Sequence, residues 1–259
     1  MIEVKDVTVR FGEKTVLDHV STVFDRGKTN LVIGRSGSGK TVLLKSIIGL
    51  VTVSGGEIIY DDVIFNQLDF SGQKGIRKEI GMLFQGCALF DSMNVEKNVM
   101  FPLDMFTNMN VSDKRDRVNF CLQRVNLENV NKLTPAELSG GMKKRVAIAR
   151  AIALNPKYLL CDEPNSGLDP QTSILIDNLI KELTEEYNMT TIVNTHDMNS
   201  VLEIGDKVTF IYEGCIEWEG SKNDILHSNI QHLDDFVFAS ELGKKIKASA
   251  AKELLDKGT

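Results

Sequence analysis

A glycine-rich segment places the strongest constraint on what this 259-residue chain can fold into: Gly34-Arg35-Ser36-Gly37-Ser38-Gly39-Lys40-Thr41. It satisfies the pattern G-x4-G-K-S/T, in which backbone N–H groups of a strand-to-helix loop surround a phosphate group. The apolar run 30–33 before it predicts a strand, and residues 41–50, with apolar side chains at helical spacing, predict a buried helix. An ordinary Ser/Gly-rich turn between a strand and a helix is the alternative.

The eight residues 34–41 are therefore candidate nucleotide-binding residues. The start of the expected helix adds a partial positive charge next to the loop. Lys40 can neutralise the β- and γ-phosphates, and the Thr41 hydroxyl can ligate Mg²⁺.

The apolar pattern elsewhere predicts an α/β fold. Residues 2–24 alternate in two stretches joined by a turn at 12–14, as antiparallel strands do. Further strands are expected at 57–65, 80–85, 158–161 and 190–195, with a hairpin over 208–218 that turns at Glu213-Gly214. Helices are expected at 113–125, 139–154 and 171–187, the last with Asp169 as N-cap before Pro170. Helices that separate strands predict a mostly parallel sheet covered on both faces.

Composition excludes several classes of protein. Hydrophobic residues make up 42% and charged residues 25%, the balance of a folded protein with a full core, and the net charge of −6 gives no general attraction to nucleic acid. The cysteines are too widely spaced for a metal site and are expected to be buried free thiols: Cys87, Cys121, Cys161 and Cys215. We expect no signal peptide and no membrane span, hence a cytosolic protein that reaches a membrane only through a partner.

Two adjacent carboxylates form a second motif. Asp162 and Glu163 end the apolar strand expected at 158–161, and neighbouring residues on a strand point to opposite faces. One carboxylate can hold the hydration shell of Mg²⁺, and the other can act as general base toward the attacking water. Acidic residues at strand ends are commonly just solvated, so this motif depends on the phosphate-binding loop upstream.

A third motif, Leu138-Ser139-Gly140-Gly141-Met142, precedes a long helix. Two glycines at a helix start expose unpaired N–H groups, and Ser139 adds a hydroxyl, which makes a second anion-binding helix end. An ordinary serine N-cap is the alternative. This motif resembles the signature of ATP-binding-cassette (ABC) ATPases. The family's other motifs follow in order: Phe11 for adenine stacking, Gln85 of the glutamine loop, Ser166-Gly-Leu-Asp169 and the switch histidine His196.

The resemblance, which spans residues 2–220, implies an α/β phosphate-loop NTPase (RecA-like) ABC cassette. It implies an N-terminal antiparallel β subdomain, a helical signature subdomain at about 90–155, and a C-terminal helical extension over 221–259. It also implies a head-to-tail homodimer in which each ATP lies between residues 34–41 of one subunit and 139–141 of the other. For Phe11 and His196, a structural role in the core or at the surface is the alternative.

The roles that the resemblance implies are specific. Glu163 is the general base, Asp162 holds Mg²⁺, and His196 contacts the γ-phosphate. Gln85 contacts Mg²⁺ or the water, and Asp169 links the two active sites. Three positions depart from the common pattern: Phe11, Met142 and Asn165. None of them is a catalytic residue, so an active ATPase is expected.

Two stretches resemble a narrower group, the ATPase subunits of Mla-type (maintenance of lipid asymmetry) phospholipid transporters. These are residues 81–95 continuing to Phe101-Pro-Leu, and residues 135–146, which include Met142. The segment after Gln85 is unusually apolar, with Ala88, Leu89, Phe90, Met93, Val95 and Val99. Such a segment suits a groove for a helix of a membrane permease, although about half of these residues are expected to belong to the core. The lysine-rich stretch 244–257 is expected to be a solvated or dimerising helix rather than a lipid contact.

Other ABC functions stay open at this point. An importer or exporter ATPase for another substrate would have the same motifs. A soluble ABC assembly factor, as in iron–sulfur cluster biogenesis, would have a similar length. The substrate and the direction of transport are not written in this chain, because in this family other components select the cargo.

Overall fold

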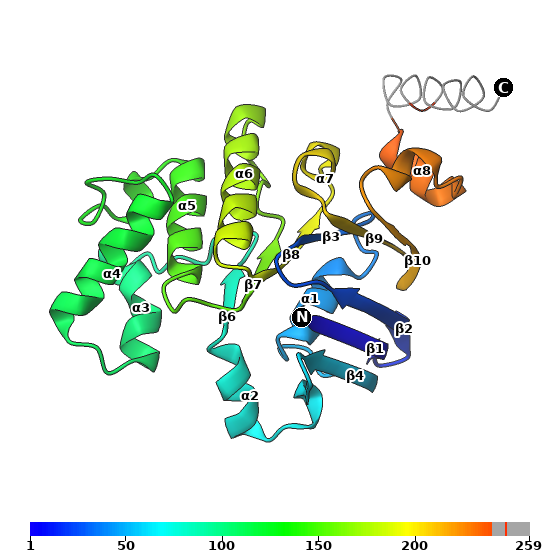
Figure 1. Cartoon of the computed structure of the whole chain (residues 1–259), viewed down its shortest axis with the longest axis horizontal. Coiled ribbons are helices and arrows are strands. Elements are labelled where there is room, and N and C mark those ends of the chain that lie inside the picture. Colours follow the sequence, from blue (N-terminus) through cyan, green and yellow to red (C-terminus); the bar gives the residue numbers. More distant parts are fainter. Residues whose placement is uncertain (240–246, 248–259) are drawn as a thin grey trace.

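The computed structural model describes residues 1–239 and residue 247, which form two β-sheets and the helices around them (Figure 1). The first sheet is antiparallel, has the order β2-β1-β4-β5 and consists of β1 (Ile2–Phe11), β2 (Lys14–Phe24), β4 (Gly55–Tyr60) and β5 (Val63–Ile64). The second has the order β10-β9-β3-β8-β7-β6 and consists of β3 (Thr29–Ile33), β6 (Ile80–Leu83), β7 (Tyr158–Asp162), β8 (Thr190–Thr195), β9 (Lys207–Tyr212) and β10 (Cys215–Gly220). Its strands are parallel except β10, which pairs antiparallel with β9. The expected antiparallel and mostly parallel sheets are both confirmed.

The helices lie on both faces of the second sheet, as expected. They are α1 (Lys40–Ile47), α2 (Phe70–Arg77), α3 (Val95–Phe106), α4 (Val111–Arg124), α5 (Gly140–Ala151), α6 (Pro170–Glu186), α7 (Met198–Ile204) and α8 (Gln231–Val237). Helices α3, α4 and α5 gather at one end of the molecule, far from the antiparallel strands (Figure 1).

Alternation along the central strands divides the interior into two cores. Val32 and Leu160 are buried in a core shared with α1 and the antiparallel sheet. Their neighbours Leu31 and Leu159 are buried in the other core, with residues of α3 to α8. Because successive strand side chains point to opposite faces, a continuous apolar strand such as β3 can serve both cores.

Three expectations need correction. The strand expected over 57–65 ends at Tyr60, where Asp61 has a φ of 51° and turns the chain into the short β5. Helix α2 had no counterpart in the sequence prediction, because it is only eight residues long and contains two glycines, Gly72 and Gly75, which weaken the helical signal. Cys215 is exposed because it begins β10 at the edge of the sheet, whereas the other three cysteines are buried free thiols as expected.

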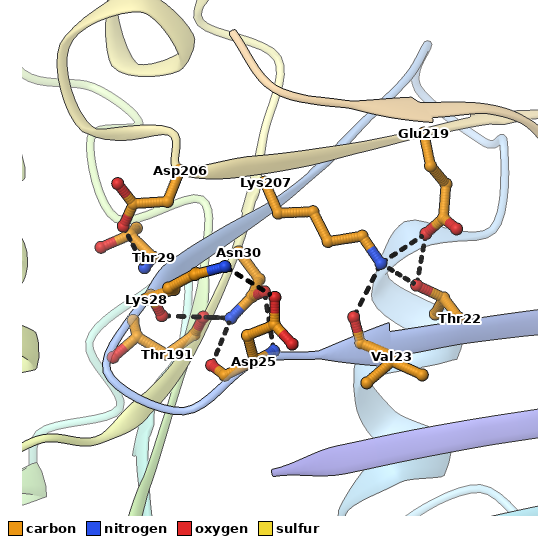
Figure 2. Close-up of polar contacts among 10 residues, drawn as sticks. All are labelled: Thr22, Val23, Asp25, Lys28, Thr29, Asn30, Thr191, Asp206, Lys207 and Glu219. Atoms are coloured by element: carbon orange, nitrogen blue, oxygen red, sulfur yellow. Dashed lines mark hydrogen bonds and ion pairs between the residues drawn. The ribbon is translucent and has the colours of Figure 1, made fainter.

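A polar joint connects the end of β2 to the six-stranded sheet (Figure 2). The Nζ of Lys207, on β9, donates to the carbonyl oxygen of Val23 at 2.8 Å and lies 3.2 Å from Oε1 of Glu219 on β10. Asn30, 1% exposed on β3, donates from Nδ2 to the carbonyl oxygen of Thr191 on β8 at 3.0 Å. The Lys207 contacts therefore hold the two sheets together at this point by hydrogen bonds as well as by the apolar core, and the Asn30 bond holds β3 and β8 together within the second sheet.

The region after residue 220 begins with a 3₁₀ turn, Asp224–His227, and continues with α8. Leu233 and Phe238 are buried in the core of the helical face, and the Phe236 ring lies 5.6 Å from that of Phe210 on β9. The lysine-rich stretch expected over 244–257 lies outside the described residues, apart from Lys247. Within the described part of the chain, no helix is both long and apolar enough to cross a membrane.

Candidate functional site

The phosphate-binding loop joins β3 to α1, as predicted, and its backbone admits only glycine at two positions. Gly34 has a φ of 149°, and a Cβ there would lie 2.3 Å from the carbonyl oxygen of Ile211. Gly39, the N-cap of α1, has a φ of 110°, and a Cβ there would lie 2.7 Å from Leu17. The loop is therefore wedged against β2 and β9, and this close packing fixes the direction in which α1 begins.

Lys40 already lies along the loop. Its side chain is 6% exposed, and Nζ donates to the carbonyl oxygens of Gly34 at 2.8 Å and of Arg35 at 3.0 Å. Burial lowers the pKa of Lys40, while the carboxylates of Glu163 and Asp162 oppose this change. A desolvated ammonium at the start of a helix is a strong site for a polyanion.

Thr41 and Asp162 meet at the end of β7. The Thr41 hydroxyl donates to Oδ1 of Asp162 at 3.1 Å, and Nδ2 of Asn194 donates to the same oxygen at 3.1 Å. A hydroxyl and a carboxylate oxygen in contact are the hard donors that Mg²⁺ prefers, and Mg²⁺ usually keeps waters and substrate phosphates as its other ligands. These residues therefore fit the predicted metal.

Glu163 lies between two other predicted catalytic residues. Its Oε2 accepts a hydrogen bond from Nε2 of Gln85 at 2.9 Å, and its Oε1 lies 3.2 Å from Nδ1 of His196. The Glu163 backbone has a φ of 49°, in the left-handed region that a residue with a side chain seldom adopts. Such strain persists only where the surroundings hold it, and its N–H donates to the carbonyl oxygen of Asn194 at 2.9 Å.

These residues line one cleft of about 730 Å³: Val16, Arg35, Ser36, Gly37, Gly39, Lys40, Thr41, Val42, Gln85, Glu163, His196 and Phe236. The structure thus brings together the phosphate-binding loop, the glutamine, the glutamate and the histidine. Phe11 is not among the lining residues, but its side chain is 53% exposed at the end of β1, so it is not a core residue.

Sequence reasoning missed four residues of this cleft region: Val16, Val42 and Phe236 line the cleft, and Lys144 binds the backbone of two lining residues. Phe236 comes from α8, and no pattern in the sequence connects that helix with the phosphate-binding loop. Lys144, on α5, is 4% exposed, and its Nζ donates to the carbonyl oxygens of Gln85 at 2.6 Å and of Glu163 at 3.3 Å. Burial lowers the pKa of Lys144. In the sequence, the only signal for Lys144 was its position among other basic residues in the helix that follows the third motif.

The third motif lies in a different cleft. Ser139 is the N-cap of α5 and accepts a hydrogen bond from the Met142 N–H at 3.2 Å, so the N-cap interpretation is confirmed. Asp169 caps α6 by accepting from the Thr172 N–H at 3.0 Å, as predicted, and hydrogen bonds from the Thr172 hydroxyl and backbone lower its pKa. A Cβ on Gly141 would lie 2.6 Å from the Thr172 methyl, so a glycine lets the two helix starts meet.

This second cleft has a volume of about 510 Å³, and Ser139, Gly140, Gly141 and Asp169 are among its lining residues. It shares no lining residue with the first cleft. Within one subunit, therefore, the structure does not bring residues 139–141 to the phosphate-binding loop.

Comparison with known proteins agrees with this geometry. A family model described as "ABC transporter" matches residues 17–166, which is more than half of the chain. The chain belongs to the ABC transporter ATPase family. It is an ABC-type ATPase coupled to transport, with the cassette fold predicted above.

Relatives of this ABC ATPase serve several transport systems. It is 39% identical to the intermembrane phospholipid transport system ATP-binding protein MlaF of Haemophilus influenzae, over 92% of this chain and 90% of MlaF. It is 41% identical to the methionine import ATP-binding protein MetN of Clostridium tetani, over 93% of this chain and 76% of MetN. A probable ribonucleotide transport ATP-binding protein, mkl of Mycobacterium leprae, is 35% identical over 93% of this chain and 70% of its own length.

Solved structures show the same cassette. The ATP-binding cassette MJ0796, dimeric in a post-hydrolysis state bound to ADP and Pi, superposes with a TM-score of 0.79 at 34% identity, over 86% of this chain and 99% of that one. CbiO1 of Clostridium perfringens, part of the ABC transporter complex cbiONQ, gives a TM-score of 0.82 at 27% identity, over 95% of this chain and 98% of that one.

The ABC ATPase also has an apolar groove of about 440 Å³, beside the glutamine loop. Aromatic side chains of that loop and of α3 line it together with Arg77 and Arg150: Phe84, Phe90, Phe101 and Phe106. Of the six residues expected to form an apolar segment here, Val95 and Val99 are core, Leu89 and Met93 are half-buried, and Ala88 and Phe90 are exposed at the groove. Two of the six are therefore core residues, fewer than the half that was expected, and Leu89 packs against that core from its edge.

Proposed function

We propose that two copies of this ABC ATPase form a head-to-tail dimer that closes on two ATP molecules and drives phospholipid transport through a partner permease. Residues 34–41 of one copy and residues 139–141 of the other would bind each ATP. The observation that carries this proposal is the separation of the two anion-binding helix starts into clefts with no common residue. A second copy would supply the second anion-binding helix start for each ATP. The dimeric ADP-bound state of MJ0796 supports the same arrangement.

Each residue of the first cleft has a distinct task in this proposal. Lys40 and the loop N–H groups would bind the phosphates, and Thr41 and Asp162 would hold Mg²⁺, which when bound supplies charge neutralisation at the phosphates. Glu163 would accept the proton of the attacking water as general base. Gln85 and His196 contact its two oxygens and so hold it in place.

The remaining predicted residues would act at the edge of the ATP site. Phe11 would stack on adenine, since its ring is exposed and next to the cleft wall of β2. Asp169 would connect the two sites of the dimer. The ATPase domain would span residues 1–220, with 90–155 as the helical subdomain and 221–259 as an extension.

ATP would hold the two subunits together. Two helix starts of opposite subunits would face one triphosphate, and loss of the terminal phosphate would remove the charge that both face. The closed dimer therefore has a higher affinity for ATP than for ADP, and this difference in affinity would drive the cycle.

Glu163→Gln tests this proposal. The variant should bind ATP, lose turnover by at least about 100-fold and accumulate as a dimer with Mg-ATP, because general-base catalysis contributes about 10²–10⁴-fold. Glu185→Gln, on the exposed side of α6, is the matched control and should behave like the parent. Normal turnover of the Glu163 variant, or a monomer in saturating Mg-ATP by light scattering, would overturn the assignment.

The permease would dock in the apolar groove and hold the ATPase on the cytoplasmic face of the membrane. An exposed aromatic groove with two arginines at its rim suits a short amphipathic helix with an acidic residue. The phospholipid substrate is supported by the similarity to MlaF and by the segment around Met142.

The substrate is tested by purifying the tagged chain with its membrane partners and reconstituting the complex in proteoliposomes. Fluorescent phospholipid should exchange between vesicle populations only with hydrolysable ATP. The similarity to MetN makes methionine uptake the second candidate, and ATP-dependent uptake of labelled methionine without lipid exchange would favour it.

A further inference from the structure

A buried carboxylate connects the two segments that hold the catalytic residues. Asp177, on α6, is 2% exposed. Its Oδ1 accepts a hydrogen bond from Nδ2 of Asn165 at 2.8 Å, and its Oδ2 accepts one from the Ser200 hydroxyl at 2.8 Å. The Asn165 amide also donates to the Ser200 oxygen at 3.1 Å. The three side chains therefore form a closed triangle in which both carboxylate oxygens are used.

The position of the triangle is significant for the site. Asn165 lies two residues after Glu163, and Ser200 lies four residues after His196, in the first turns of α7. A cavity of about 360 Å³ beside the triangle is lined by Glu163, Asn165, Asp177 and His196, among others. Asp177 thus contacts the segments that follow both members of the Glu163–His196 pair, namely the loop after Glu163 and helix α7 after His196, although α6 itself contributes no group to the ATP cleft.

The strained backbone of Glu163 indicates why such a connection is needed. A φ of 49° is retained only where the following loop cannot relax. The Glu163 carbonyl accepts from the Ser166 N–H at 3.2 Å, and the Asn165 carbonyl accepts from the Leu168 N–H at 3.2 Å, so the loop is a tight turn. The Asn165 side chain fastens this turn to α6 and α7.

We propose that Asp177 is a positioning residue for ATP hydrolysis. By binding Asn165 and Ser200 together, it holds the Glu163 carboxylate against His196 and fixes the loop that leads to Asp169. This inference rests on the proposed role of Glu163 as general base. It also gives a purpose to Asn165, one of the three positions where the sequence departs from the common family pattern.

The charge of Asp177 suits this role. Burial raises its pKa to about 6, Ser200 and Asn165 oppose the rise, and the nearby carboxylates Asp197 and Glu203 add to it. At neutral pH the group is therefore ionised, and both of its oxygens can accept a hydrogen bond.

The test compares the steady-state ATPase activity of the full chain with three buried positions changed one at a time. Asp177→Asn keeps the volume and removes one acceptor, and Ser200→Ala removes one donor. Each should lower kcat about tenfold, since a misplacement of about 1 Å can cost about 100-fold and a smaller displacement costs less, and should leave the KM for ATP within about twofold. Thr184→Val is the control, since Thr184 is a buried hydroxyl on the same helix, hydrogen-bonded to Thr191.

The outcomes separate a positioning role from a merely structural one. The proposal expects a lower kcat with an unchanged KM for the Asp177 and Ser200 variants. The melting temperature of the Asp177 variant should not fall. The Thr184 variant should keep the kcat of the parent. Parental kcat in both Asp177→Asn and Ser200→Ala, while Glu163→Gln is inactive, would overturn this inference alone. Activity of Glu163→Gln would instead overturn the proposed function.

Discussion

The stability of the Asp177→Asn variant, measured relative to the parent, should increase as the pH rises. The folded state keeps the Asp177 carboxyl buried, and its pKa is raised from 3.8 to about 6. Between these two pH values the folded state binds a proton that the unfolded state has released, so the stability of the parent falls as the pH increases. Above about pH 6 the loss of stability caused by the buried, ionised carboxylate is complete. An asparagine does not titrate and carries no such cost.

The size of the effect follows from the pKa change. A shift of this size corresponds to about 3 kcal/mol at neutral pH, since each pKa unit is worth about 1.4 kcal/mol. About half of that develops between pH 5 and pH 8, so the stability difference between variant and parent should grow by about 1.5 kcal/mol over this range. For a chain of this length that corresponds to a gain of roughly 3–6 °C in the difference of melting temperatures.

Thermal unfolding of both proteins at pH 5, 6, 7 and 8, at constant ionic strength, measures this quantity. The difference between the two curves is the informative value, because every other titrating group contributes equally to both and cancels. Thr184→Val should give a curve parallel to that of the parent. If the Asp177 and parent curves are also parallel between pH 5 and pH 8, the reasoning about the buried carboxylate is refuted.

Three further predictions concern other contacts. Lys144→Met removes the ammonium from the two carbonyl groups that it holds and should reduce kcat several-fold, whereas Lys143→Met should not; a coupled ATPase assay decides this. Gly141→Ala should lower the free energy of unfolding by about 1–3 kcal/mol through its clash with a threonine methyl, and Gly140→Ala should have a smaller effect, as urea unfolding can show. Phe90→Asp should prevent co-purification of the permease without changing basal ATPase activity, because the groove is apolar and shares no lining residue with the ATP cleft.

The last of these needs a control outside the groove. Phe120, on α4, is 41% exposed, does not line the groove and packs under the guanidinium of Arg117. Phe120→Asp should leave co-purification intact. Equal loss of the permease in both variants would show that a general disturbance of the helical region, rather than the groove, is responsible.

Local patterns explain most of what the sequence could predict. Strand alternation located both sheets, and Asp169 before Pro170 marked the start of α6 correctly because capping is a local property. The phosphate-binding loop was predictable because its glycines, Lys40 and Thr41 are contiguous. Helix α2 was not, since a helix of eight residues with two glycines gives only a weak helical signal.

Contacts between residues far apart in the sequence account for what could not be predicted. Lys144 is one basic residue among several on α5, and only the fold shows that its ammonium is buried against two catalytic loops. Asp177 and Ser200 are ordinary polar residues of helical segments until α6 and α7 pack together. The exposure of Cys215 likewise depends on its place at the edge of the sheet.

The hydrogen-bonded joint around Lys207 and Asn30 has a consequence for motion in the molecule. Lys207 links the end of β2 to β9 and β10, and Asn30 links β3 to β8 beside it (Figure 2). These bonds resist any sliding of β2 against β9 and β10. On the other side of the ATP cleft, the Lys144 ammonium likewise ties α5 to the backbone of Gln85 and Glu163, so a displacement of α5 is felt directly at the catalytic glutamate.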